Sequence, residues 1–133
     1  MKKIFSVSVL LFISCQKPIS CNDITYDKGF SYYNGSVFSG DCEAYYPLGQ
    51  KYSFQKYLNG LDHGSWKFYF ENGNLKTEAF FSLGKRVGNW KYFFENGKIW
   101  KSHFYKQGEK DSIWITYNEN GDIEEKFNFS NNN

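Results

Sequence analysis

The sequence predicts an all-β fold, an array of about four β-hairpin repeats of 24 residues that form an elongated, curved antiparallel sheet. Three observations predict it. The segment 64–87 recurs as 88–111, aromatic residues alternate with polar ones along it, and Asn-Gly pairs follow the alternating runs. Self-similarity at a fixed period is the signature of a repeat array, in which each unit packs only on its neighbours.

The composition is that of one β domain. The chain has 133 residues, of which 41% are hydrophobic, and Phe, Tyr and Trp together supply 29 of them. A helical or doubly wound core would be rich in Leu, Ala, Ile and Val instead. No stretch after residue 14 has apolar residues at helical spacing.

The first residues have the features of an export signal. A basic start precedes an apolar run over residues 4–13 and the small residue Ser14. A run of about ten residues is too short to span a bilayer as a helix, so we expect residues 1–14 to be a removed signal peptide. The segment 12–15, Phe-Ile-Ser-Cys, resembles the lipobox of bacterial lipoproteins, which implies a lipid on Cys15. The alternatives are an ordinary secretory signal and a cytosolic protein with an apolar N-terminus.

Residues 15–29 are expected to be a lipidated tether and lead-in. The part over 16–22 contains Pro18 and reads as a tether, and 23–39 holds one or two lead-in strands that cover the first edge of the sheet. Cys21 and Cys42 are an even pair, which an oxidising compartment would join in a disulfide. The alternative is two unpaired thiols, with Cys42 filling the buried slot that tryptophans fill in later units.

The repeat domain is expected over 30–129, with units from about 40, 64, 88 and 112, and a disordered tail over 130–133. In the second unit, Trp66, Phe68 and Phe70 alternate with polar residues as in a half-buried strand. Asn72-Gly73 predicts a type I′ turn, because both residues tolerate positive φ. A return strand follows from Leu75, and a second turn at 83–88 leads to the next hairpin.

These spacings resemble the MORN repeat, in the variant found in bacterial proteins of the YwqK antitoxin family. The pattern is Gly-x-Trp-x-x-Tyr/Phe-x-x-Asn-Gly-Lys, followed by Tyr-x-x-Gly-x-x-x-Gly. The matching residues are Gly64, Trp66, Tyr69, Asn72, Gly73 and Gly84 in one unit and Gly88, Trp90, Phe93, Asn96, Gly97, Lys98, Tyr105 and Gly108 in the next. The first unit departs from the pattern at Cys42 and the last at Ser112. Terminal units of an array are commonly atypical because they act as caps.

Charge and motif content exclude several functions. Without Lys2 and Lys3 the 16 basic residues fall to 14, equal to the 14 acidic ones, so the basic surface of a nucleic-acid binder is missing. His63 and His103 have no metal-ligand cluster around them. The carboxylates Glu71, Glu95 and Glu119 recur with the period of the repeat, whereas acid/base catalysis needs a localised, unequal pair. We therefore expect no catalytic residues, no metal and no cofactor.

Aromatic side chains are the candidate binding residues. Trp66, Trp90 and Trp114 should form a ladder from hairpin to hairpin on one face, with Tyr69, Phe93 and Tyr117 in a second column on the opposite face. Contiguous exposed apolar area marks an interaction site. The alternative is that both columns pack internally.

The sequence thus predicts a non-enzymatic lipoprotein of the bacterial cell envelope, at the outer membrane rather than the inner one. Its array would bind a protein or glycan partner, and its lipid the membrane. The resemblance implies an alternative, an antitoxin that occludes a toxin, although a cytosolic antitoxin needs no export signal. A carbohydrate-binding module that stacks aromatic rings on sugars is a further alternative.

Overall fold

The computed structural model describes residues 17–130, and its regular structure there is strand apart from one 3-10 turn, η1 (Cys21–Asp23). The predicted all-β fold is confirmed. The expected signal peptide, the Cys15 lipid site and all but the first residue of the expected tail lie outside the described residues. Within the described part, no helix is long and apolar enough to cross a membrane.

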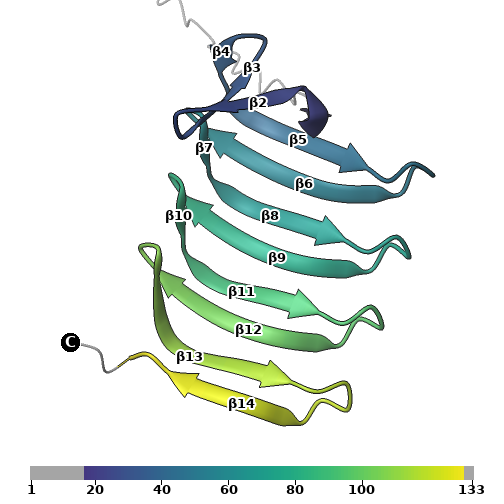
Figure 1. The fold of residues 1–133 in the computed structure, drawn as a ribbon, viewed down its shortest axis with the longest axis vertical. Coiled ribbons are helices and arrows are strands. Elements are labelled where there is room, and N and C mark those ends of the chain that lie inside the picture. The colour runs from purple at the N-terminus through teal and green to yellow at the C-terminus, as the bar shows by residue number, and fades with distance from the viewer. Residues whose placement is uncertain (1–16, 131–133) are drawn as a thin grey trace, which may run out of the picture.

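Four antiparallel hairpins stack into one curved sheet (Figure 1). The paired strands are β5 (Gly40–Tyr45) with β6 (Lys51–Leu58), β8 (Gly64–Tyr69) with β9 (Leu75–Ser82), β11 (Gly88–Phe93) with β12 (Ile99–Lys106), and β13 (Glu109–Tyr117) with β14 (Ile123–Asn128). The first three hairpins begin at the glycines that start the sequence units. The last begins at Glu109, because β13 continues without a break through Ser112.

Type I′ turns join β6, β9 and β12 to the segments that follow them. In the second unit, Leu83 and Gly84 both have positive φ, 46° and 82°, which is the requirement of this turn. The short strands β7 (Leu61–Asp62) and β10 (Lys85–Arg86) pair back on β6 and β9 before the chain enters the next hairpin. These turns lie on the side of the sheet where Figure 1 labels β7 and β10.

The turns at Asn-Gly differ from the predicted type. Gly73 has a φ of 88°, but Asn72 does not have the positive φ that a type I′ turn needs. The Gly73 N–H donates to the Phe70 carbonyl and the Phe70 N–H to the Asn74 carbonyl, both at 2.9 Å, so the loop has three residues and ends in a glycine bulge. The Asn72 side chain stabilises this loop, because its oxygen accepts a hydrogen bond from the Asn74 N–H at 2.9 Å.

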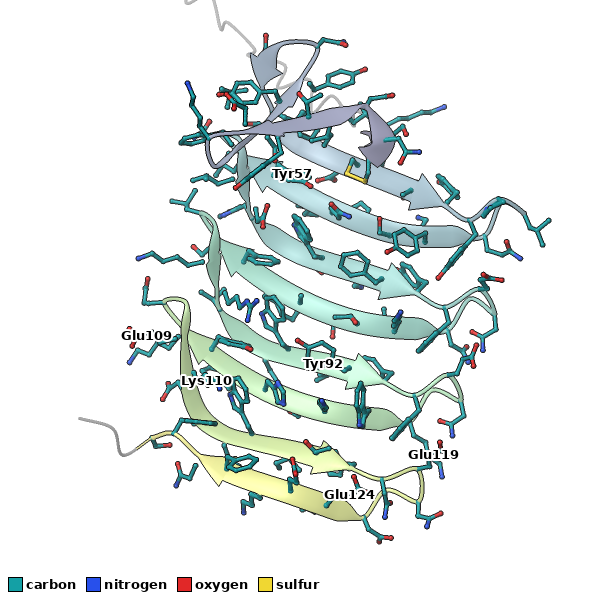
Figure 2. The ribbon with its side chains drawn as sticks, viewed as in Figure 1. Tyr57, Tyr92, Glu109, Lys110, Glu119 and Glu124 are labelled. Atoms are coloured by element: carbon teal, nitrogen blue, oxygen red, sulfur yellow. A yellow bond between two sulfur atoms is a disulfide. The ribbon has the colours of Figure 1, made fainter. Side chains whose placement is uncertain are left out.

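The N-terminal segment is more structured than a tether. β1 (Ile19–Ser20) pairs in parallel with β5, and β2 (Ile24–Asp27), β3 (Phe30–Tyr33) and β4 (Ser36–Val37) form a separate sheet beside the first hairpin (Figure 1). Cys21 and Cys42 lie at disulfide-bonding distance, with Cα atoms 5.0 Å apart (Figure 2). Cys42 is fully buried in the slot that tryptophan fills in later units. The predicted pair is thus at disulfide-bonding distance, and Cys42 fills the tryptophan slot without being an unpaired thiol.

The sheet has little enclosed core. Among the described residues only five hydrophobic side chains are buried: Phe38, Cys42, Ala79, Trp90 and Tyr105. The largest cluster joins Ala79, Trp90 and Tyr105, in the middle of the array. A single layer buries side chains only against lateral neighbours, so most aromatic rings stay half-exposed.

Candidate binding surface

Strand alternation divides the side chains between two faces of the sheet. We call the face that carries Trp66, Trp90 and Trp114 the tryptophan face. Trp66 pairs across the hairpin with Ala79, and Trp90 with His103, which places these partners on the same face. Figure 2 labels two members of the tryptophan face, Tyr57 at the first hairpin and Tyr92 at the third.

A chain of touching aromatic rings runs along this face. Successive ring centroids lie 5.0 to 5.3 Å apart in the order Tyr57, Trp66, Phe81, Trp90, Tyr105, Trp114 and Phe129. The tryptophans do not touch one another, because Phe81 and Tyr105, from the ends of the return strands, lie between them. Edge-on and tilted contacts at these distances stabilise aromatic pairs beyond their area burial.

Each tryptophan also bonds the preceding repeat through its indole N–H. Trp66 donates to the Lys56 carbonyl at 2.8 Å, Trp90 to the Phe80 carbonyl at 3.0 Å and Trp114 to the Phe104 carbonyl at 2.8 Å. Between β9 and β11 the register pairs only Lys91 with Glu78 and Tyr92 with Thr77. The Trp90 indole is a second donor to its carbonyl, because the Phe80 carbonyl also accepts the Val87 N–H at 3.0 Å.

Trp90, one of the candidate binding residues, lies inside the ring chain. Its side chain is only 7% exposed, packed between Phe81 and Tyr105. Trp66 and Trp114 are partly buried against the same cluster. Rings held edge to edge with neighbours have no free face for a ligand, so this chain of rings chiefly stabilises the array.

Cations cover the exposed edge of the ring chain. The Arg86 guanidinium lies 5.0 Å from the Trp90 ring centroid, and the Lys110 ammonium lies 4.7 Å from that of Trp114. Lys110 sits at the side of the sheet opposite Glu119 and Glu124 in Figure 2. Such contacts are attractive because the ring face is negative.

His103 stacks flat on Trp114, with centroids 3.9 Å apart and planes 10° from parallel. Burial lowers the pKa of His103, and the charges of Lys101 and Lys110 lower it further. The neutral imidazole is thereby favoured. This histidine is part of the packing, as expected, and His63 accepts the Leu83 N–H at 3.2 Å within a turn.

An open pocket lies nearer the Asn-Gly turns, between the second and third hairpins. Its volume is about 330 Å³, and its lining includes Phe70, Lys76, Tyr92, Phe94 and Trp100. The register of β11 with β12 passes from Tyr92–Lys101 to Phe93–Ile99, which leaves Trp100 as an unpaired bulge residue. Its ring lies 5.9 Å from Phe94 and is 39% exposed. The bulge thus turns a large aromatic into the pocket.

Ionic contacts are distributed unequally between the faces. In the described residues the three ion pairs are Lys51–Glu43, Lys56–Asp41 and Lys67–Glu78, all on the face opposite the tryptophans. Tyr69, Phe93 and Tyr117 lie on that opposite face too, paired with Leu75, Ile99 and Ile123. The cations of the tryptophan face, Lys76, Arg86, Lys101 and Lys110, contact aromatic rings.

The histidines and carboxylates of the described chain do not gather into a metal site. From residue 17 to residue 130, no group of three or more His, Cys, Asp or Glu side chains could hold a metal ion. Glu71 and Glu95 sit one per turn; the Glu95 carbonyl accepts from Asn72 and Asn74 of the preceding turn. Their periodic placement serves the stacking of the turns.

Sequence reasoning missed Trp100 and Lys76 as surface residues. They occupy the same repeat position as Tyr52 and Glu124, so no residue type recurs there. The available signal was that Trp100 is the one tryptophan outside the 24-residue series.

Three segments of the chain match the model of the MORN repeat variant: residues 62–82, 86–107 and 110–131. They cover the second, third and fourth hairpins. Comparisons with curated proteins and with solved structures gave no match. The first hairpin, β5–β6, has the same strand pairing and glycine bulge although the family model does not match it.

Proposed function

Because the chain carries MORN repeats, we propose that it is a non-enzymatic binding module of the bacterial cell envelope whose tryptophan face holds a protein partner. One observation carries the proposal. The pocket beside Phe94 and Trp100 opens on the second and third hairpins, whereas the small sheet β2–β3–β4 lies at the first hairpin (Figure 1). Exposed apolar area of this kind marks interaction sites.

The array suits a binding surface because its aromatic side chains are held rigidly. Phe94 and Trp100 contact each other, and the ring chain beside them fixes the backbone of three neighbouring repeats. Rigid aromatics supply a large contact area at low cost in conformational entropy. A rigid aromatic surface of this kind favours the binding of a partner over catalysis.

A protein partner agrees with the pocket better than a glycan does. The lining residues are aromatic rings, one threonine and the stem of Lys76, with Glu95 at the rim. Sugar hydroxyls buried there would lack hydrogen-bond partners, which is costly. An antitoxin role would require that the neutralised toxin is itself exported, and the partner's identity decides that point.

Lipid attachment at Cys15 would hold this surface close to the membrane and raise its effective concentration for membrane-bound partners. Two acyl chains anchor stably where one does not. Mass spectrometry of the native protein should find a mature N-terminus at Cys15 that carries a diacylglyceryl group. An unmodified N-terminus downstream of Cys15 would contradict the anchor but not the binding surface.

Affinity capture from envelope extract tests the binding surface. We expect Trp100→Ala to abolish capture of the partner that the native protein retains. Ile99→Ala is the matched control, because Ile99 is its neighbour on β12, is also 39% exposed and pairs on the opposite face. Equal capture by both variants, or partner loss only on Tyr69→Ala or Tyr117→Ala, would move the surface to the other face; Phe93 is not a test residue because it also lines the pocket.

A further inference from the structure

We infer that the partner segment is an extended acidic peptide in the polyproline II conformation, which crosses the strands along the tryptophan face and places an apolar residue in the pocket at Trp100. This inference rests on the proposed function and names the occupant of the same surface. It is carried by three features of the described residues: the spacing of the repeats, the chemistry of the pocket and the distribution of charge.

The repeat spacing matches the polyproline II helix. Each unit adds two strands to the sheet, and strands lie about 4.8 Å apart, so equivalent residues recur about every 9.6 Å. A polyproline II helix rises about 3.1 Å per residue with three residues per turn, about 9.3 Å. Two α-helical turns rise about 10.8 Å. The mismatch per repeat is thus about 0.3 Å for polyproline II and about 1.2 Å for a helix.

The pocket has the aromatic walls that such peptides use. Phe70 and Phe94 occupy one repeat position in successive units, with Tyr46 in the unit before them. Tyr46 packs on Tyr52 at 5.2 Å and Phe94 on Trp100 at 5.9 Å, and in the hairpin between them the Lys76 ammonium lies 5.5 Å from the Phe70 ring centroid. An aromatic ring is thus present at this position in three successive units. Aromatic-lined grooves bind proline-rich segments because the polyproline II helix is already ordered before binding.

The cations near the pocket favour a peptide with acidic side chains. Lys76 lines the pocket together with one acidic residue, Glu95. Lys101 lies beside it, 4.0 Å from the Trp100 ring centroid, and Arg86 lies farther along the same face, so the cations outnumber the single carboxylate. None of the three ion pairs of the described chain involves these cations. Carboxylates of a peptide that lies between them would find complementary charge on both sides.

Direct binding of synthetic peptides tests the inference. Fluorescein-labelled peptides of about 15 residues, roughly five polyproline II turns, would carry repeated Glu-Pro-Pro, repeated Lys-Pro-Pro or repeated Glu-Gly-Gly. The native protein should bind the Glu-Pro-Pro peptide about tenfold more tightly than either other peptide, a difference of one decade in Kd. Equal binding of Glu-Gly-Gly would overturn the polyproline II conformation, and equal binding of Lys-Pro-Pro the charge argument.

Matched variants locate the peptide. Trp100→Ala should weaken Glu-Pro-Pro binding about tenfold and Ile99→Ala should leave it unchanged. Lys101→Gln should weaken it and reduce its salt dependence, whereas Lys91→Gln, on the opposite face of the same hairpin, should do neither. Thermal melts of each variant confirm folding. Unchanged binding by Trp100→Ala or Lys101→Gln would overturn the site.

An anionic glycan is the competing occupant, and an oligogalacturonate of similar length is its probe. Tighter binding of the glycan than of the Glu-Pro-Pro peptide would overturn the inference. If capture of an envelope protein depends on Trp100 but no peptide binds, the inference fails while the proposed function stands. If neither depends on Trp100, both fail.

Discussion

Individual residues in this array are constrained by the backbone that the repeat imposes. The opening position of the last three units has a φ of 72° at Gly64, 68° at Gly88 and 57° at Ser112. A side chain in this left-handed region costs about 1–2 kcal/mol. Ser112 therefore carries strain that the glycines of the earlier units avoid.

We predict that Ser112→Gly raises the free energy of unfolding by about 1 kcal/mol, because it relieves this strain. Urea denaturation measures the change. Gly88→Ser is the reverse substitution and should lower the free energy of unfolding by a similar amount. A Cβ at Gly88 would meet only Phe80, at an ordinary 3.9 Å, so the cost would come from the positive φ and not from a clash. A Ser112→Gly protein that is less stable than the native one would show that the serine side chain contributes more than its φ costs.

His103 should make stability depend on pH. Its pKa is lowered in the folded state by burial and by two lysines, so the unfolded chain binds more protons near the ordinary value of 6.5. Stability from this residue is full above pH 6.5 and is lost as pH falls from that value through the lower pKa of the folded state. We predict that melts of His103→Gln depend less on pH across this window than native melts. An identical pH dependence in the two proteins would contradict this account of the stacked imidazole.

At the scale of the hairpin, the tryptophan on the first strand of each of the last three hairpins joins its own unit to the preceding one. Trp90 is the example. It packs between two rings and donates to a carbonyl of the earlier return strand. The turn at the other end makes a weaker link, in which Asn72 and Asn74 donate to the Glu95 carbonyl. Lateral stability therefore depends on the indole more than on the turn side chains.

Trp90→Ala should lower the free energy of unfolding by about 3–5 kcal/mol, the usual cost of large aromatic truncations at packed sites. Glu95→Ala should change it by less than about 0.5 kcal/mol, because only the backbone of Glu95 takes part in the turn contacts. Chemical denaturation of the two variants checks this. Small effects for both would mean that Trp90 contributes little to the packing between repeats.

The whole molecule is a one-layer array, so its energetics should follow nearest neighbours. Trp66 and Trp114 belong to units separated by the whole third hairpin, and the ring chain joins them only through Phe81, Trp90 and Tyr105. Distant, independent sites add in their effects on stability, and touching residues do not.

We therefore predict that the losses of stability from Trp66→Phe and Trp114→Phe add within about 0.5 kcal/mol in the double variant. Trp90→Phe and Tyr105→Phe, whose rings lie 5.3 Å apart, should deviate from additivity by more than that. Double-mutant cycles from urea melts give both numbers. Strong coupling between the distant pair would indicate that the array unfolds through contacts that skip a repeat.

The amino-acid sequence by itself determined the repeat period and the hairpin units, and it singled out Cys21 and Cys42 as a candidate pair. These features depend on residues close in the chain. Alternating aromatics predict a strand, and Asn-Gly predicts a turn, whatever lies across the sheet. The period then predicts the order of stacking, because each unit can bury its aromatic face only against the next.

Tertiary structure alone decided which aromatics are exposed. A bulge leaves Trp100 unpaired and directs its ring to the pocket. The alternation of side chains along a strand does not predict where a bulge occurs. The sequence predicts that Trp90 belongs to a ladder and leaves open whether that ladder is packed or exposed; rings from the return strands before and after it enclose it. The type I′ turns likewise formed at Leu83-Gly84 rather than at Asn72-Gly73, because the glycine bulge fits the three-residue loop. Burial depends on what lies across the sheet, and local sequence does not contain that information.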